Sequence, residues 1–330
     1  MSLLKNHMNS KDLFFVIIIG YFISTMNTPT WDIDKTAKNA FVININFPDP
    51  SIPNDFSFKF LLSFDRHWDN PKSSHDMQIQ HLDEVKRLKT FCLDGGDLFC
   101  AMQGKYDRRA SKSDVRPEHQ NGEYLDSLVN TASEFFEPYA DCMPVLGLGN
   151  HETAILKAHE TNLTDRLVHS LKERTGQKIY MGGYSTWVRF RFRFGKDRRI
   201  RASKVLWMFH GSGGDAPMSF GTLNVKRQGS IIPDADLVAT GHSHNEFVVP
   251  LTRARLTKGG TPYLDEQLHV KVPTYKEEYG KGIKGWHVER GAPPKPIGAT
   301  WIVFKPLAHS VKTGLLTHDK QLYIDTERAK

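Results

Sequence analysis

Short apolar runs, each followed at once by glycine, histidine or a carboxylate, are the sequence feature that most limits how this chain can fold. The runs are residues 58–64 (FKFLLSF), 91–93 (FCL), 145–148 (VLGL), 204–209 (KVLWMF) and 235–240 (ADLVAT). Each is too short for a helix and fits a buried β-strand. Because ligands bind beyond the carboxyl ends of strands in α/β sheets, the sequence predicts that these polar endings gather at one edge.

Stretches with helical spacing alternate with these runs in the first half of the chain. Helices are predicted over 76–90, over 122–137 and from about 153 to 174. The second half is rich in strands, with further strands predicted at 187–194, 247–251 and 300–304. The strand at 187–194 (WVRFRFRF) places phenylalanine on one face and arginine on the other. This order predicts sheet layers covered by helices.

The two ends of the chain have a different composition from the middle. Residues 1–55 are predicted to form an N-terminal extension, in which 26–55, rich in Asn, Asp and Pro, connects to the main domain. Residues 56–330 are predicted to form that domain, with a loop-rich C-terminal extension over about 255–330.

An apolar segment at 13–25 (LFFVIIIGYFIST) bears on localisation. It is shorter than the roughly 20 residues that a membrane-spanning helix needs. Its length also fits a secretory signal, but Asp12 lies at its boundary and no Ala-x-Ala site follows. We therefore favour a packing segment in a cytoplasmic protein without stable membrane insertion, and a signal peptide or anchor stays open.

Composition excludes several classes of protein. With 39% hydrophobic and 25% charged residues, the chain is not disordered, collagenous or a coiled coil overall. Its three cysteines, Cys92, Cys100 and Cys142, are too few and too irregularly spaced for a disulfide scaffold. The net charge of +7 permits a polyanionic partner without requiring one.

The polar segments after the strands combine carboxylate, amide and imidazole groups. They are Asp65-Arg66-His67, Gly96-Asp97, Gly149-Asn150-His151-Glu152, His210-Gly211 and Gly241-His242-Ser243-His244. Such ligands suit Mn²⁺, Fe and Zn²⁺, and the lack of thiolate argues against a closed structural zinc site. Two cations about 3.5–4 Å apart need a bridging carboxylate. Asp97, behind a glycine turn, suits that place.

A zinc-protease motif is excluded at the same position. The His-Glu-x-x-His pattern that begins at His151 would need a second histidine where Ile155 stands.

In this order the five segments resemble the calcineurin-like metallophosphoesterase superfamily. The likeness covers residues 58–250, and the stretches GDLFCAMQGKYDRR, GNHE and HGSGG are similar to phosphoesterases of phages and mobile elements. The resemblance implies an α/β/β/α sandwich of two mixed β-sheets flanked by helices. One departure is Cys100, where the family often has Asp or Asn three residues after the Gly-Asp carboxylate.

The resemblance also implies a site with two divalent cations, for which we favour Mn²⁺ and keep Fe or Zn²⁺ as alternatives. One cation would be held by Asp65, His67, Asp97 and His244, and the other by Asp97, Asn150, His210 and His242. Asp97 would bridge them, and His151 would support the transition state without binding metal. The implied reaction is in-line attack of a metal-activated hydroxide on phosphorus.

The substrate is left open among three readings. We favour a phosphodiesterase or nuclease acting on DNA or RNA, because of the charge, the Arg face at 189–193 and a basic loop with Lys105, Arg108, Arg109, Lys112 and Arg116. The alternatives are a phosphomonoesterase and a catalytically silent scaffold. The intact ligand set argues against the scaffold.

Overall fold

The computed structural model describes residues 28–48, 56–101, 114–215, 219, 221–280, 288, 291, 293–306 and 322–329. The apolar segment at 13–25 lies outside these ranges. Within them, no helix has the length and apolar character needed to cross a bilayer.

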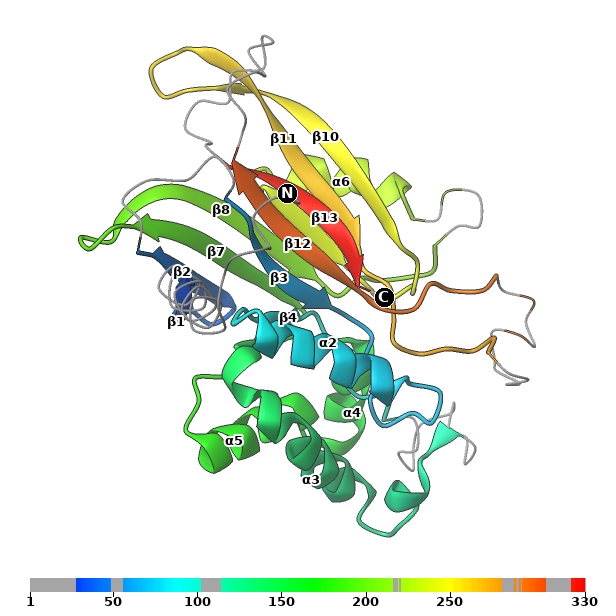
Figure 1. The fold of residues 1–330 in the computed structure, drawn as a ribbon. Coiled ribbons are helices and arrows are strands. Elements are labelled where there is room, and N and C mark those ends of the chain that lie inside the picture. The colour runs from blue at the N-terminus through cyan, green and yellow to red at the C-terminus, as the bar shows by residue number, and fades with distance from the viewer. Residues whose placement is uncertain are drawn as a thin grey trace, which may run out of the picture.

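Two mixed β-sheets form the centre of the molecule (Figure 1). The larger sheet has the spatial order β1 (Thr30–Ala37), β2 (Ala40–Phe47), β7 (Ser185–Phe194), β8 (Arg199–Phe209), β9 (Leu237–Thr240), β11 (Pro262–Lys271) and β10 (Phe247–Leu256). The smaller sheet has the order β13 (Leu322–Ala329), β12 (Ala299–Pro306), β3 (Phe58–Ser63), β4 (Cys92–Asp94), β5 (Val145–Leu146) and β6 (Tyr180–Met181). In the smaller sheet β3 to β6 are parallel, whereas β12 pairs antiparallel with both of its neighbours.

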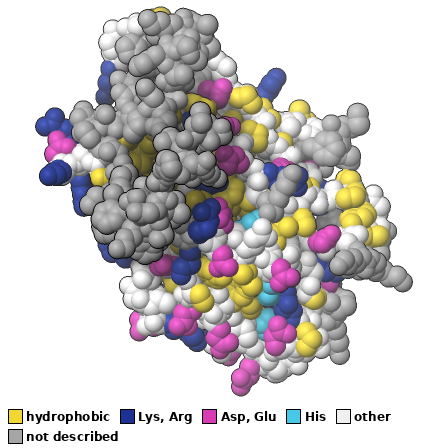
Figure 2. Space-filling model, viewed as in Figure 1, with side chains coloured by type: hydrophobic (Ala, Val, Ile, Leu, Met, Phe, Trp, Pro, Cys, Tyr) yellow, Lys and Arg dark blue, Asp and Glu magenta, His cyan; other side chains and the backbone are white. Residues whose placement is uncertain are grey.

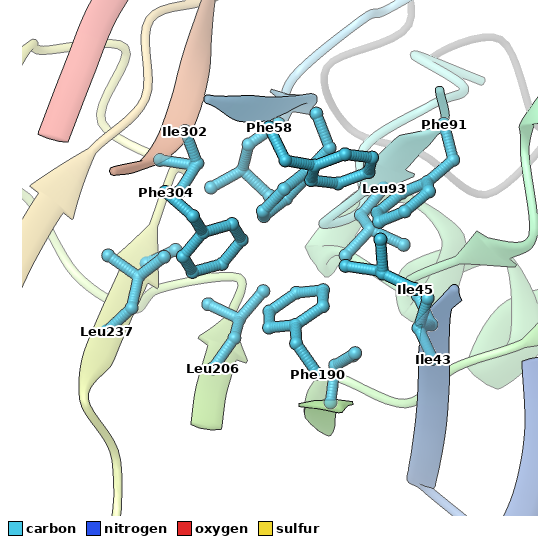
Figure 3. Packing of buried hydrophobic residues seen from close by; sticks show 14 of the residues in the cluster. Ile43, Ile45, Phe58, Phe91, Leu93, Phe190, Leu206, Leu237, Ile302 and Phe304 are labelled. Atoms are coloured by element: carbon cyan, nitrogen blue, oxygen red, sulfur yellow. The ribbon is translucent and has the colours of Figure 1, made fainter. Parts of the chain in front are cut away.

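The inner faces of the two sheets pack against each other through a large apolar core. Figure 3 shows Phe58 and Phe304 of the smaller sheet facing Phe190 and Leu206 of the larger one. On β7, as the alternation predicted, the phenylalanines are buried in this core and the arginines point outward.

Helices flank both sheets. The smaller sheet is covered by α2 (His75–Arg87), α3 (Tyr124–Phe136), α4 (Asn150–His159) and α5 (Leu163–Thr175), with short 3-10 turns η2 (Pro117–His119) and η3 (Glu137–Cys142). A second apolar cluster lies between these helices and that sheet. Helix α6 (Leu223–Ile231) lies on the larger sheet, apart from the others (Figure 1). The predicted α/β/β/α sandwich is therefore confirmed.

The structure differs from the sequence prediction in three stretches. Residues 30–47, expected to be part of a connector over 26–55, form β1 and β2, and β2 is buried in the core between the sheets. The expected loop-rich extension over 255–330 contains β11 and β13 in addition to β12, which corresponds to the strand predicted at 300–304. The single helix predicted from 153 to 174 is two helices. Glu160 adopts a left-handed backbone that ends α4, and Asn162 caps α5 by accepting the Asp165 N–H at 3.1 Å.

Candidate metal centre

Five loops converge where the two sheets meet at the carboxyl ends of their strands. They follow β3, β4 and β5 of the smaller sheet and β8 and β9 of the larger one. They bring together the side chains predicted as ligands, namely Asp65, His67, Asp97, Asn150, His210, His242 and His244. The order of the strands in space, rather than in sequence, creates this meeting point.

The backbone of these loops is unusual. Nine non-glycine residues in the described ranges have a positive φ, and five of them are Asp65, His67, Asp97, His242 and His244. Left-handed backbone costs free energy for residues with a Cβ, and such outliers cluster at functional sites. The loops are therefore shaped to aim these side chains at one point.

One group of possible ligand atoms consists of Asp65, His67 and His244, all buried. The Asp65 Oδ1 lies 3.9 Å from the His67 Nε2 and 3.4 Å from the His244 Nε2. The two Nε2 atoms are themselves 3.1 Å apart. Three ligand atoms at this separation can bind a single cation.

The second group consists of Asp97, His210 and His242, with the Asn150 amide beside it. The Asp97 Oδ2 lies 3.2 Å from the His210 Nε2. The Asn150 Oδ1 lies 3.1 Å from the His210 Nε2 and 2.6 Å from the His242 Nδ1. His210 also lies 3.9 Å from the Asp65 Oδ1, so the two groups adjoin.

His151 lies at the edge of this arrangement, partly exposed. Its Nδ1 is 2.5 Å from the Cys100 carbonyl oxygen, which can only accept, so Nδ1 carries the hydrogen. Its Nε2 is then left facing Asp97, 3.7 Å from the Oδ2. The backbone N–H of His151 donates to the other oxygen of Asp97 at 3.0 Å.

The donor set fits divalent cations. The Asp65 Oδ1 is buried and has no hydrogen-bond partner within the described residues, although three imidazole nitrogens surround it. An isolated buried carboxylate oxygen is costly unless it is paired with a donor or a metal. Carboxylate, imidazole and amide ligands at adjoining positions are those that Mn²⁺, Fe or Zn²⁺ accept.

The electrostatics suit cation binding at His67, His242 and Asp97. At His210 burial is outweighed by Asp97, which raises the pKa to about 10, so a cation must displace a proton from this imidazole. Burial, together with His151 and His244, holds the pKa of His67 well below its usual range, so this imidazole is neutral and can offer a lone pair. Burial and the neighbouring His210 lower the pKa of His242 in the same way. Although burial opposes its charge, Asp97 keeps a pKa well below its usual range, because His210 and His151 stabilise the carboxylate.

Two supporting carboxylates were not assigned a role from the sequence. Glu152 is buried and accepts backbone N–H groups from Asp97, Phe99 and Gly149, at 3.1, 2.9 and 2.8 Å. It therefore ties the loop after β4 to the start of α4. Asp69 accepts the N–H groups of Cys100 and Ala101, at 2.5 and 2.8 Å.

Arg66, which stands between Asp65 and His67 in the sequence, is a further supporting residue to which the sequence assigned no role. Its guanidinium is fully buried and donates to Asp94 at 2.8 Å, to Gln78 at 3.1 Å and to Ser63 at 3.0 Å. It also lies over the ring of Tyr275, 5.1 Å from the centroid. Arg66 thus anchors the loop that carries Asp65 and His67.

Replacing Gly241 by alanine is expected to weaken cation binding. A Cβ at this position would lie 2.5 Å from the Asp65 Oδ2 and 2.7 Å from the Phe64 Cβ, so the carboxylate must move. We expect about 10- to 100-fold weaker Mn²⁺ binding by calorimetry, the usual size of effect when a group that orients a ligand is disturbed. Gly214→Ala is the control, because a Cβ there meets open space. Equal affinities of the two variants would contradict the prediction.

No family model matches the chain, and no curated protein matches its sequence. Among solved structures, the chain is similar over 83% of its length to the whole of Vps29 from Entamoeba histolytica, crystallised with Zn²⁺, at 8% identity and a TM-score of 0.32. It is also similar, over 76% of its length and 83% of the other chain, to a conserved protein of Streptococcus pneumoniae described as a predicted phosphoesterase, at 10% identity and a TM-score of 0.28.

Proposed function

We propose that this protein is a metal-dependent phosphoester hydrolase whose centre takes two divalent cations. The observation that carries the proposal is the pair of adjoining ligand groups, Asp65, His67 and His244 beside Asp97, His210 and His242. Asn150 supplements the second group, and Asp97 is proposed as the bridging ligand. When bound, such cations lower the pKa of water and neutralise phosphate oxygens.

The protein's own groups complete the proposed chemistry. His151 can hold a proton on its Nε2, on the partly exposed side of the centre, while its Nδ1–H is fixed by the Cys100 carbonyl. It is therefore placed to protonate the departing alkoxide. Asn150 and His242 are also partly exposed, so a phosphate would approach from their side.

Replacing His151 by alanine is expected to lower kcat by about 10²- to 10⁴-fold, the range for loss of a general acid. The loss should be larger for diphenyl phosphate than for bis-p-nitrophenyl phosphate, because nitrophenolate leaves without a proton. Mn²⁺ affinity should stay within about threefold, since alanine keeps the backbone N–H bond to Asp97. His169→Ala, at an exposed position of α5, should match the parent protein. An equal loss for both substrates would contradict the acid role.

Nucleic acid remains the substrate that the sequence favours, but the arginine face does not strengthen it. Tyr184, directly before β7, contacts the candidate ligand His210, with ring centroids 5.4 Å apart. This end of β7 is therefore the one next to the candidate metal centre. At about 3.3 Å per residue, Arg189 and Arg193 lie roughly 17 and 30 Å farther along the strand. The face in Figure 2 mixes positive and negative side chains over its described residues. Of the five basic residues named in the predicted loop, only Arg116 lies in the described ranges, and it donates to the Ser73 carbonyl at 3.3 Å.

Hydrolysis by the purified protein with Mn²⁺ tests the proposed function. The substrates are bis-p-nitrophenyl phosphate, p-nitrophenyl phosphate, and single- and double-stranded DNA. Hydrolysis of any of them that EDTA abolishes and Mn²⁺ restores would support the proposal. Cleavage of the monoester alone would favour the phosphomonoesterase alternative. Mn²⁺ binding without any hydrolysis would favour the silent scaffold.

A further inference from the structure

A cavity of about 330 Å³ adjoins the candidate metal centre on the side of the larger sheet. It lies between the outer face of that sheet and α6, and His242 and Gly241 line one end of it. This volume falls within the range of ordinary small-molecule sites. His242 belongs to both the cavity and the candidate metal centre. One end of a ligand in the cavity would therefore lie close to that metal centre.

The floor of the cavity is aromatic. Trp207 and Phe209 are alternate residues of β8 and therefore share its outer face. Their rings are stacked, with centroids 5.2 Å apart and planes inclined by 11°. Phe247, at the start of β10, adds a third aromatic side chain. Because the Trp207 and Phe209 rings each already cover one face of the other, a planar ligand ring could stack on an outer face of the pair, as bases do on aromatic side chains.

Helix α6 forms the opposite wall with three polar side chains and one isoleucine. Asn224, Arg227, Gln228 and Ile231 line the cavity, at a spacing that places them on one face of the helix. Val225 is the buried residue of α6, so this helix spans the aromatic floor instead of packing closely on it. Two amides and a guanidinium can donate to the edge of a heteroaromatic ring, and the amides can also accept from it.

The wall between the cavity and the centre contains an ion pair between Lys271 and Asp215. The Lys271 ammonium donates to both oxygens of Asp215, at 2.9 and 2.8 Å, and to the Ser243 hydroxyl at 2.7 Å. Asp215 also accepts from Ser243 and Asn245. Since Ser243 stands between His242 and His244, this network holds the histidine turn.

We propose that this cavity binds a nucleobase, so that the substrate of the adjoining centre is a nucleotide-type phosphoester. The inference rests on the proposed function, because it assigns the phosphate of the same molecule to the metal centre. A phosphoserine peptide or a sugar phosphate has no planar ring for the floor of Trp207 and Phe209. The amides of α6 match the mixed donors and acceptors of a base edge.

Nucleoside binding tests the proposal without requiring catalysis. Calorimetry of the full chain with adenosine and cytidine, in EDTA and again with Mn²⁺, should show binding of at least one of them that is independent of the metal. Ribose 5-phosphate in EDTA should not bind. Trp207→Leu should weaken nucleoside binding by about 10-fold or more, in line with the loss of one stacking partner. Trp187→Leu is the matched control, since the Trp187 ring packs beside Trp207, with centroids 6.3 Å apart, but does not line the cavity.

A surface variant covers the case in which Trp207→Leu fails to fold. Arg227→Ala should weaken nucleoside binding by at least about threefold, whereas Lys226→Ala, one residue away and outside the cavity lining, should not. Absence of binding by both nucleosides, or equal losses in Trp207→Leu and Trp187→Leu, would overturn the nucleobase site even if bis-p-nitrophenyl phosphate is hydrolysed. Nucleoside binding with no hydrolysis would instead overturn the hydrolase and keep the site.

Discussion

Asp97→Asn is expected to lower kcat by at least about 10³-fold and to weaken Mn²⁺ binding by at least about 100-fold. The substitution keeps the shape of the side chain but removes the charge. Its amide N–H₂ would face the His210 Nε2, which now lies 3.2 Å from the Asp97 Oδ2. A donor there cannot serve as a ligand, and the proposed bridge between the two cations is lost.

Metal content and thermal stability check this prediction together. Calorimetric Mn²⁺ titration should show weaker binding, and the increase in Tm on adding Mn²⁺ should shrink, because a ligand stabilises only the state that binds it. Asp141→Asn is the control, at a side chain that is half exposed and lies 3.6 Å from Lys86. Unchanged Mn²⁺ affinity in Asp97→Asn would remove Asp97 from the centre.

The strands and loops that carry the candidate centre could be predicted because their signal is local. An apolar run such as 58–64 or 235–240 indicates a buried strand by itself, and the polar residues directly after it mark the loop. The structure has β3 at Phe58–Ser63 and β9 at Leu237–Thr240. Which strands pair with one another depends on residues that are distant in sequence. The pairing of β8 with β9, and of β3 with β4 and β12, had to come from the structure.

Strands at or near sheet edges were missed for a physical reason. β1 (TWDIDKTA) and β13 (LYIDTERA) each have one neighbouring strand and carry many polar residues, so neither shows a continuous apolar run. β11 carries charged residues in its first half, where only one residue is buried. Such strands are stabilised by pairing with partners distant in sequence, which a window of neighbouring residues does not reveal.

The residues that support the centre were hidden in the same way. A charged residue such as Arg66 is expected to be exposed unless its partner is known. That partner, Asp94, lies at the end of a different strand. Glu152 was visible in the Gly-Asn-His-Glu segment, but its N–H donors include Asp97 and Phe99, more than fifty positions earlier in the chain.

Arg66→Met is expected to have the largest effect on stability, lowering the free energy of unfolding by about 3–5 kcal/mol. Methionine fills much of the space but leaves the Asp94 carboxylate, which is fully buried, without its cation. It also removes the donors to Gln78 and Ser63. Urea unfolding followed by circular dichroism measures the change. Arg87→Met is the matched control, because its ion pair with Glu84 is solvent-exposed and should contribute little.

The double variant Arg66→Met/Asp94→Asn separates lost charge from lost packing. If the uncompensated carboxylate causes the destabilisation, the double variant should be more stable than Arg66→Met alone, since no net charge is then buried. Both variants should bind Mn²⁺ more weakly than the parent protein, because Arg66 anchors the loop in which Asp65 and His67 hold left-handed backbone. Were Arg66→Met no less stable than Arg87→Met, the buried pair would have no structural role. The unusual backbone beside it would then need another source of support.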